Sequence, residues 1–193
     1  YSGGVDNTLK LWNIVDTTYI DTLFASLDVL IYRYGHDTLI TSISGQRTSL
    51  PSHNNTRIIS CSTDNTLRLW KIEANTQMVY RGRRMDVSME CCTMVSSTYF
   101  LTGDMNGSVN MFTADKKKSV YSVKVVLRVK GEEEAHGFDE GKEKWVVSLG
   151  SLPLTNLAAS GSYSDCVRFW DVNPSNRDKD GEILKPVASL PMV

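Results

Sequence analysis

The sequence lacks the features that mark several large classes of protein. No apolar run in its 193 residues approaches the roughly 18 that a membrane-spanning helix needs, so we expect no membrane partner. The formal net charge is −1, so the chain as a whole is no cationic clamp for nucleic acid, and any such contact must come from local patches. Apolar residues at helical spacing (i, i+3, i+4, i+7) are also missing, which disfavours an α-helical fold.

Cysteines are too few and too poorly spaced for a metal site. The four of them form no C-x-x-C pair, and only three histidines could act as additional ligands, so we expect neither zinc nor any other cofactor. Cys91 and Cys92 are adjacent and would point to opposite faces of a strand, which excludes both a shared metal and a disulfide between them. The sequence therefore predicts reduced, half-buried thiols.

Motifs of enzymes are absent as well. There is no nucleophile elbow, Walker loop or HExxH sequence. His36, Ser60 and Asp64 include the residue types of a hydrolase triad, but the same pattern recurs along the chain, and a recurring pattern indicates a rule of the fold rather than a catalytic site. We expect no enzymatic activity and no small-molecule substrate.

What the sequence does contain is a repeat. Four segments align without gaps, and each has a small hydroxyl residue, a polar turn, alternating apolar and polar residues, and a final aromatic residue. A turn pair such as Asn106-Gly107 tolerates the positive φ of a tight hairpin, and the alternation has the period of a β-strand. The sequence therefore predicts an all-β chain whose repeats are residues 2–12, 60–70, 102–112 and 160–170.

The spacing of the repeats predicts a β-propeller. Trp70 and Phe112 are separated by the length of a four-stranded blade, and the longer steps are explained by loop insertions at 46–56 and 130–144. About three and a half blades are present, of an expected seven, and because an open fragment would leave long unpaired edges we expect further blades in the native chain. The predicted segments are the end of one blade at 1–14, full blades at 19–72, 76–113 and 119–172, and the start of the next at 183–193.

The repeats resemble those of the WD-repeat family. The Gly-His dipeptide at 35–36 precedes one repeat, and a Trp-Asp dipeptide ends another at 170–171. Blades of this family carry a structural network of His, Ser or Thr, Asp and Trp that satisfies buried polar groups. The residues that match it one by one are His36, Ser60, Asp64 and Trp70.

The later repeats depart from the family pattern. The third has Thr102, Asn106 and Phe112, so it lacks the tryptophan, and no Gly-His precedes it. The fourth keeps Ser160 and the tryptophan but has Ser164 where aspartate is expected. We therefore expect these two blades to be held less tightly than the one that has the whole network.

Basic clusters are the candidate contacts for phosphate. Lys116, Lys117 and Lys118 follow the last strand of the 76–113 blade as loop lysines, and Lys124, Arg128 and Lys130 alternate as they would on one face of a strand. The alternative is ordinary solvent-facing charge, offset by the acidic residues at 132–134 and 139–140. A third cluster surrounds Gly82 and consists of Arg81, Arg83 and Arg84.

A narrower resemblance covers chiefly residues 99–170. The segment 100–112 runs into the lysines 116–118, an Ala-His-Gly loop follows at 135–137, and Trp-Val-Val-Ser-Leu opens the next blade at 145–149. This order is similar to that of the WD-repeat subunits of the U3 small nucleolar ribonucleoprotein. That family also fits the segments 22–24, 34–37 and 69–82.

The resemblance implies a non-catalytic scaffold that binds the box B/C region of U3 small nucleolar RNA. Its partners would be a kink-turn-binding protein and other small-subunit processome proteins. It would act in pre-rRNA processing inside the nucleus, in the nucleolus. The implied RNA contacts are Lys116, Lys117, Lys118 and His136, and charge alone adds Arg81, Arg83 and Arg84. The alternative is a general WD-repeat adaptor that binds proteins without RNA, which would have no need of both the lysine run and the Ala-His-Gly loop.

Overall fold

The chain is almost entirely β-structure, and the prediction of an all-β fold is confirmed. In the part that the structure describes, no helix is long and apolar enough to cross a membrane. The structure is a computed structural model, and its described residues are 1–23, 35–45, 57–72, 74, 76–84, 86–125, 145–152, 155–163, 166–174 and 183–191.

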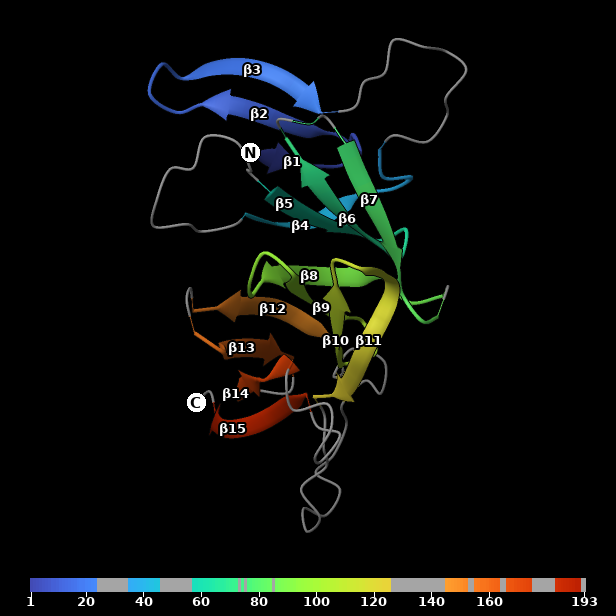
Figure 1. The fold of residues 1–193 in the computed structure, drawn as a ribbon, viewed down its shortest axis with the longest axis vertical. Coiled ribbons are helices and arrows are strands. Elements are labelled where there is room, and N and C mark those ends of the chain that lie inside the picture. The colour runs from blue at the N-terminus through green and yellow to red at the C-terminus, as the bar shows by residue number, and fades with distance from the viewer. Residues whose placement is uncertain are drawn as a thin grey trace.

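The strands form four successive antiparallel units, each an up-and-down meander (Figure 1). The first unit has three strands, β1 (Ser2–Gly3), β2 (Leu9–Asn13) and β3 (Thr18–Leu23). The second has β4 (Ile40–Gly45), β5 (Arg57–Ser62), β6 (Thr66–Lys71) and β7 (Thr76–Arg81). The third has β8 (Met89–Met94), β9 (Tyr99–Asp104), β10 (Ser108–Thr113) and β11 (Lys116–Lys124). The fourth has β12 (Val146–Ser151), β13 (Leu157–Ser162), β14 (Cys166–Val172) and β15 (Leu184–Pro191).

The strand pairing divides the chain at different points from the predicted blade segments. β7, β11 and β15 each pair with the strand before them, so each completes the sheet of the preceding repeat. The segment 183–193 was predicted to start a new blade, but β15 within it is the fourth strand of the last sheet. The reason is that the aromatic residue of the repeat ends the third strand and not the fourth, and alternation alone does not show which neighbour an outer strand joins.

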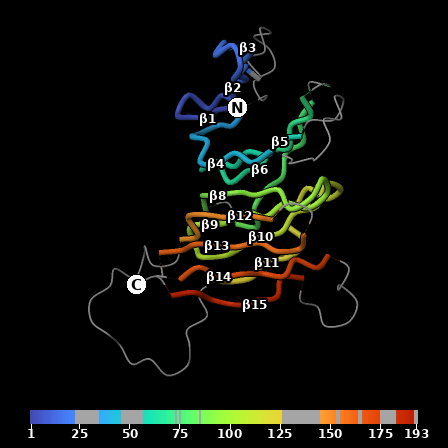
Figure 2. The backbone as a smooth tube through the Cα atoms, turned by 90° about the vertical axis from the view of Figure 1, so that its left-hand side faces the viewer, coloured from blue at the N-terminus to red at the C-terminus, as the bar shows by residue number. Residues whose placement is uncertain are grey.

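The sheets stack face to face, like the blades of a propeller (Figure 2). Since successive side chains of a strand point to opposite faces, neighbouring residues enter different cores. Ile58 contributes to the core shared with the first sheet, whereas Ile59 contributes to the core shared with the third. Both faces of the two central sheets are therefore buried.

The cysteines follow the same alternation. Cys92 packs toward the second sheet, where its backbone N–H donates to Ser42 Oγ at 3.3 Å, whereas the Cys91 thiol donates to the Val146 carbonyl of the fourth sheet at 3.2 Å. The prediction that the two point to opposite faces is confirmed. Cys61, Cys91 and Cys92 are fully buried rather than half-buried, and Cys166 is half-buried. Burial raises the pKa of the Cys91 thiol well above its usual range.

The hairpin turns that lead into β2, β6 and β10 share one backbone conformation. Asn7, Asn65 and Gly107 occupy the same position of the repeat and have φ values of 61°, 60° and 74°. Asparagine and glycine are the residues that adopt this left-handed conformation most readily. The polar turns of the sequence repeat are thus a requirement of backbone geometry.

The second and third sheets also meet at their outer edges. Arg81 of β7 and Lys118 of β11 pair in parallel, which joins the two meanders into one continuous hydrogen-bonded sheet. Figure 1 shows β7 and β11 converging on the same side of the molecule. This junction brings together two basic clusters that are separated in sequence.

Candidate nucleic-acid interface

A line of buried hydrogen bonds runs through the second sheet. The Trp70 indole Nε1–H donates to Ser60 Oγ at 2.8 Å, and Ser60 Oγ lies 2.7 Å from His36 Nε2. His36 Nδ1 lies 3.1 Å from the Asp64 carboxylate. The four residues of the predicted network are thus joined in the order Trp70, Ser60, His36 and Asp64. Ser60 is 0% exposed and its hydroxyl is hydrogen-bonded on both sides, so the arrangement satisfies buried polar groups.

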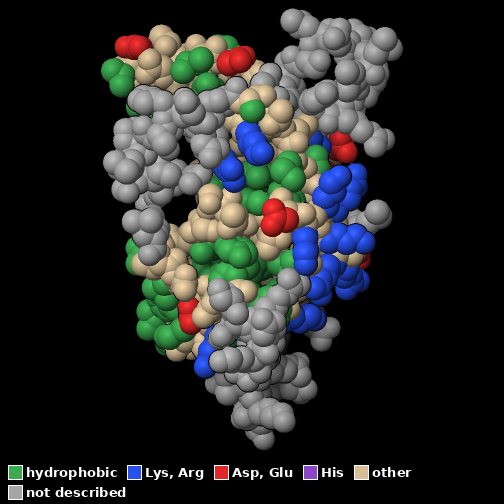
Figure 3. Space-filling view, viewed as in Figure 1, with side chains coloured by type: hydrophobic (Ala, Val, Ile, Leu, Met, Phe, Trp, Pro, Cys, Tyr) green, Lys and Arg blue, Asp and Glu red, His purple; other side chains and the backbone are tan. Residues whose placement is uncertain are grey.

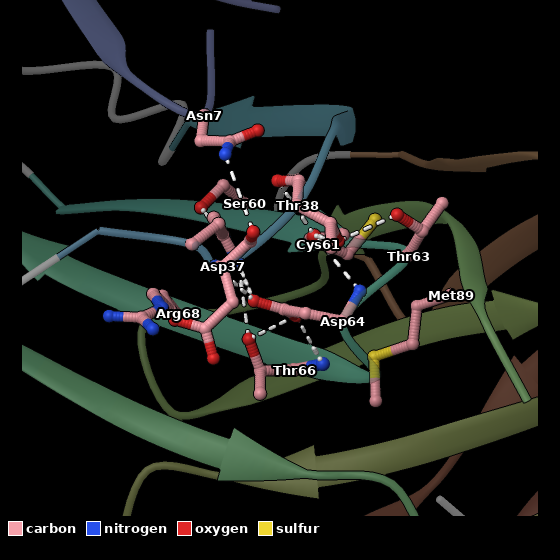
Figure 4. A network of polar contacts seen from close by, with 12 residues as sticks. Asn7, Asp37, Thr38, Ser60, Cys61, Thr63, Asp64, Thr66, Arg68 and Met89 are labelled. Carbon is pink, nitrogen blue, oxygen red and sulfur yellow. Dashed lines mark hydrogen bonds and ion pairs between the residues drawn. The ribbon is translucent and has the colours of Figure 1, made fainter. Parts of the chain in front are cut away.

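Asp64 fixes the loop and the hairpin turn at one end of this line (Figure 4). Its carboxylate accepts hydrogen bonds from the backbone N–H of Asp37 at 2.9 Å and from that of Thr66 at 2.8 Å. Burial opposes ionisation of this carboxyl, but hydrogen bonds from His36 and Thr66 outweigh it and hold its pKa well below the usual range. The turn therefore carries a fixed negative charge that is fully engaged inside the fold.

The other sheets keep only part of the network. Trp170 donates to Ser160 Oγ at 2.8 Å, in the same way as Trp70 donates to its serine. In the third sheet Phe112 replaces tryptophan and has no N–H to donate, and the buried Thr102 hydroxyl has no hydrogen-bond partner among the described residues. The third sheet therefore has an unsatisfied polar group where its neighbours have an indole–hydroxyl bond.

Positive side chains gather where β7 meets β11. Arg81, Lys116, Lys117 and Lys118 are all exposed, and Lys and Arg side chains line this side of the space-filling view (Figure 3). Exposed Arg83 joins them, since its Nε donates to Ser119 Oγ of β11 at 3.0 Å. We call this surface the basic edge and define it by these five residues.

Lys116, Lys117 and Lys118 lie in a strand, whereas the sequence predicted a loop. They were expected in a loop after the last strand of their blade, but they form the start of β11, its outer strand. The pattern Lys-Lys-Lys-Ser gives no alternation of polarity, so sequence alone did not show a strand here. The consequence is that their backbone is held by the sheet, which orders the charges along one edge.

The charge of the basic edge is uncompensated in the described part of the chain. Its five cations make no ion pair there, and the adjacent Arg84 pairs only with exposed Asp86, at 3.4 Å. An exposed ion pair of this kind contributes little to stability and is easily exchanged for another anion. His136, Arg128 and Lys130, also proposed from sequence, lie outside the described residues.

A cleft of about 300 Å³ with a mixed polar and apolar lining lies beside the basic edge. Arg83 and Arg84 contribute to it from the loop after β7, and Lys124 contributes from the end of β11. Sequence reasoning missed its other polar residues because each looks like an ordinary turn or strand residue. The one available signal is that Asn110 stands where the other repeats have Lys10, Arg68 and Arg168. The polar groups not anticipated are Asn65, Asp104, Asn106, Ser108, Asn110 and Ser122.

Comparison with known proteins decides which family these sheets belong to. The family model "WD domain, G-beta repeat" matches residues 28–71. The chain carries WD40 repeats. Over all of its residues this WD-repeat chain also superposes on the structure entitled "Crystal structure of RRP9 WD40 repeats", with a TM-score of 0.73, 25% identity and coverage of 50% of that chain.

Similar sequences agree with the structural match. The U3 snoRNP-associated protein-like EMB2271 of Arabidopsis thaliana is 30% identical over 193 residues, which are 100% of this chain and 35% of that protein. The human U3 small nucleolar RNA-interacting protein 2 is 29% identical over 109 residues, which are 54% of this chain and 21% of that protein. The resemblance to this family is confirmed. The WD-repeat chain spans about a third, or less, of the length of these relatives.

Proposed function

We propose that this WD-repeat chain is part of a non-catalytic scaffold that binds U3 small nucleolar RNA during pre-rRNA processing and assembly of the small ribosomal subunit. The observation that carries the proposal is the basic edge, where the backbone of two neighbouring sheets aligns exposed cations that form no ion pair with any described residue. The proposal that the bound polyanion is U3 RNA is supported by the names of the chain's relatives, which are called U3 snoRNP-associated and U3 small nucleolar RNA-interacting proteins.

The mechanism is electrostatic and positional. Lysine and arginine donate charge-assisted hydrogen bonds to phosphate oxygens, and each phosphate neutralised releases condensed counterions into solution. Because β11 holds the three lysines in an extended strand, alternate side chains point to opposite sides of it. The edge therefore contacts the RNA backbone by charge and shape, and carries little base specificity of its own.

The stacked sheets supply the rigidity that a scaffold requires. Both faces of the central sheets are buried, so the basic edge is fixed relative to the rest of the fold. In this proposal the RNA partner is the box B/C region, bound together with a kink-turn-binding protein and other processome proteins in the nucleolus. Lys116, Lys117, Lys118, Arg81 and Arg83 are the proposed RNA contacts, with Arg84 beside them.

Charge reversal at one lysine tests the proposal against a matched control. Lys117 and Lys185 are both exposed and both lie near the start of the outer strand of a four-stranded sheet. Lys117→Glu is expected to weaken binding to a box B/C transcript roughly five- to tenfold and to lower the salt slope by about one. Lys185→Glu makes the same change of charge away from the basic edge and should bind like the unmodified protein.

The alternative function makes the opposite prediction. Purified protein would be titrated against labelled RNA at several salt concentrations, and RNA bound to the protein in cell extract would be sequenced. Equal affinities for the two variants, or recovery of proteins with no enriched RNA, would contradict the proposal and favour a protein-binding adaptor.

A further inference from the structure

We propose that the cleft beside the basic edge holds one unpaired nucleotide of the bound RNA, with its phosphate at the rim and its base on the floor. The inference rests on the proposed function and deepens it, because it names the part of the RNA that enters the fold. The cleft lies between the second and third sheets, at the turns that join their strands.

The rim of the cleft presents cations from two different elements. Arg83 and Arg84 follow β7, and Lys124 ends β11; all three are exposed and line the cleft. Neither Arg83 nor Lys124 makes an ion pair with any described residue. Cations that converge from separate elements around a hollow form a binding geometry for a single phosphate group, which accepts several hydrogen bonds at once.

The polar side chains on the floor are preorganised by hydrogen bonds. One oxygen of the Asp104 carboxylate accepts hydrogen bonds from the backbone N–H groups of Asn106 and Ser108, at 3.0 and 2.8 Å. Its other oxygen accepts from the Asn110 amide at 3.0 Å. Asn110 is paired across the sheet with Ser122, whose side chain also lines the cleft. These side chains are thus held in place before a ligand arrives, and they offer hydrogen-bonding atoms beside the apolar side chains of Val87 and Met89, which also line the cleft.

This distribution of charge favours a nucleotide over an acidic peptide. A peptide that places carboxylates in the cleft would meet the Asp104 carboxylate on the floor, and like charges at short range repel. A nucleotide instead carries its negative charge at one end and hydrogen-bond donors on the base at the other. The volume is at the lower end of the range for small-ligand sites, about 300–1,000 Å³, and fits a single flat group rather than a folded element.

The wall of the cleft is also fixed. The Asn65 amide, at the hairpin turn of the second sheet, donates to the backbone carbonyl of Arg84. A side chain at Gly82 would collide with Asn65, so only glycine allows the turn and the loop to approach this closely. The loop that carries the rim arginines is therefore positioned by the sheet before it, and the site needs little ordering when it binds.

Removal of the Asn110 amide tests the inference. Asn110→Ala is expected to weaken binding about tenfold to an RNA hairpin with unpaired loop nucleotides, and to leave binding to a fully paired RNA of the same length unchanged. Ser122→Ala is a second variant on the floor and should reduce loop binding in the same direction. Asn13→Ala is the matched control: Asn13 also donates from its amide to a nearby carboxylate, that of Asp16 at 2.6 Å, but lies on the first sheet.

The outcomes separate this inference from the proposed function. If the unmodified protein binds neither RNA, the proposed function fails. If it binds both, and both floor variants bind the loop RNA as the unmodified protein does, the cleft inference fails while the basic edge remains as the RNA contact. Competition of poly-glutamate with the loop RNA that is lost in Asn110→Ala would also overturn the inference, since it would assign the cleft to an acidic peptide.

Discussion

The buried hydroxyl of Thr102 leads to a prediction whose sign is unusual. The side chain is 0% exposed and its oxygen has no hydrogen-bond partner in the described part of the chain, because Phe112 stands where the neighbouring sheets have an indole N–H. Burial of an unpaired hydroxyl costs about 1–3 kcal/mol, and Thr102→Val removes that group while keeping the branched shape. We expect the variant to be more stable by about 1 kcal/mol, a rise in Tm of about 2–4 °C for a chain of this length.

The control is the equivalent serine of the next sheet. Ser160 accepts a hydrogen bond from the Trp170 indole at 2.8 Å, so Ser160→Ala strands a buried donor and should lose about 1–3 kcal/mol. Thermal and urea unfolding of the three proteins, followed by circular dichroism, measures both effects. Loss of stability in Thr102→Val, of the size seen in Ser160→Ala, would refute the reasoning, because it would show that the threonine hydroxyl is satisfied.

Two further predictions concern the carboxylate of the network and the packing between sheets. Because the pKa of Asp64 is lower in the folded state than in the unfolded state, its ionised form stabilises the fold above about pH 4, and this contribution disappears as the pH falls toward the lower folded value. Asp64→Asn should therefore be less stable than the unmodified protein at pH 7, and urea unfolding should show the difference in stability narrowing as the pH falls below about 4; a difference that is constant with pH contradicts this. Gly103→Ala should lose about 1–3 kcal/mol, because the added methyl would meet the side chains of Val146 and Cys91. Gly150→Ala, where a methyl meets nothing within 4 Å, is the control in the same unfolding assay, and equal losses would refute the packing argument.

Local geometry was the part of the fold that sequence could predict well. Asn7, Asn65 and Gly107 align in the repeat because each hairpin requires a positive φ at that point, and the backbone imposes this residue by residue. The same holds for the opposite orientation of Cys91 and Cys92, which follows from the period of a strand. Such features depend on neighbours in sequence and need no knowledge of the whole fold.

The sequence does not predict features that depend on which strand joins which sheet. Nothing in the residues of β7 shows that it pairs with β6 rather than opening the next blade. The meeting of Arg81 with Lys118 depends on that pairing, so sequence alone identified two basic clusters but not one edge. The cleft was harder still to predict from sequence, because its floor is assembled from a turn and two strands whose polar residues have ordinary local roles.

The offset between sequence repeat and sheet has a practical consequence for cutting or joining such a chain. A boundary placed after Trp70, where the repeat ends, would separate β6 from β7 and expose a row of unpaired backbone groups on the remaining sheet. A boundary between Gly82 and Ser88 would leave both sheets whole, and would break only the outer junction and the loop between them. The unit that is copied along the sequence is thus not the unit that can be excised, and each copy depends on the one after it for its outermost strand.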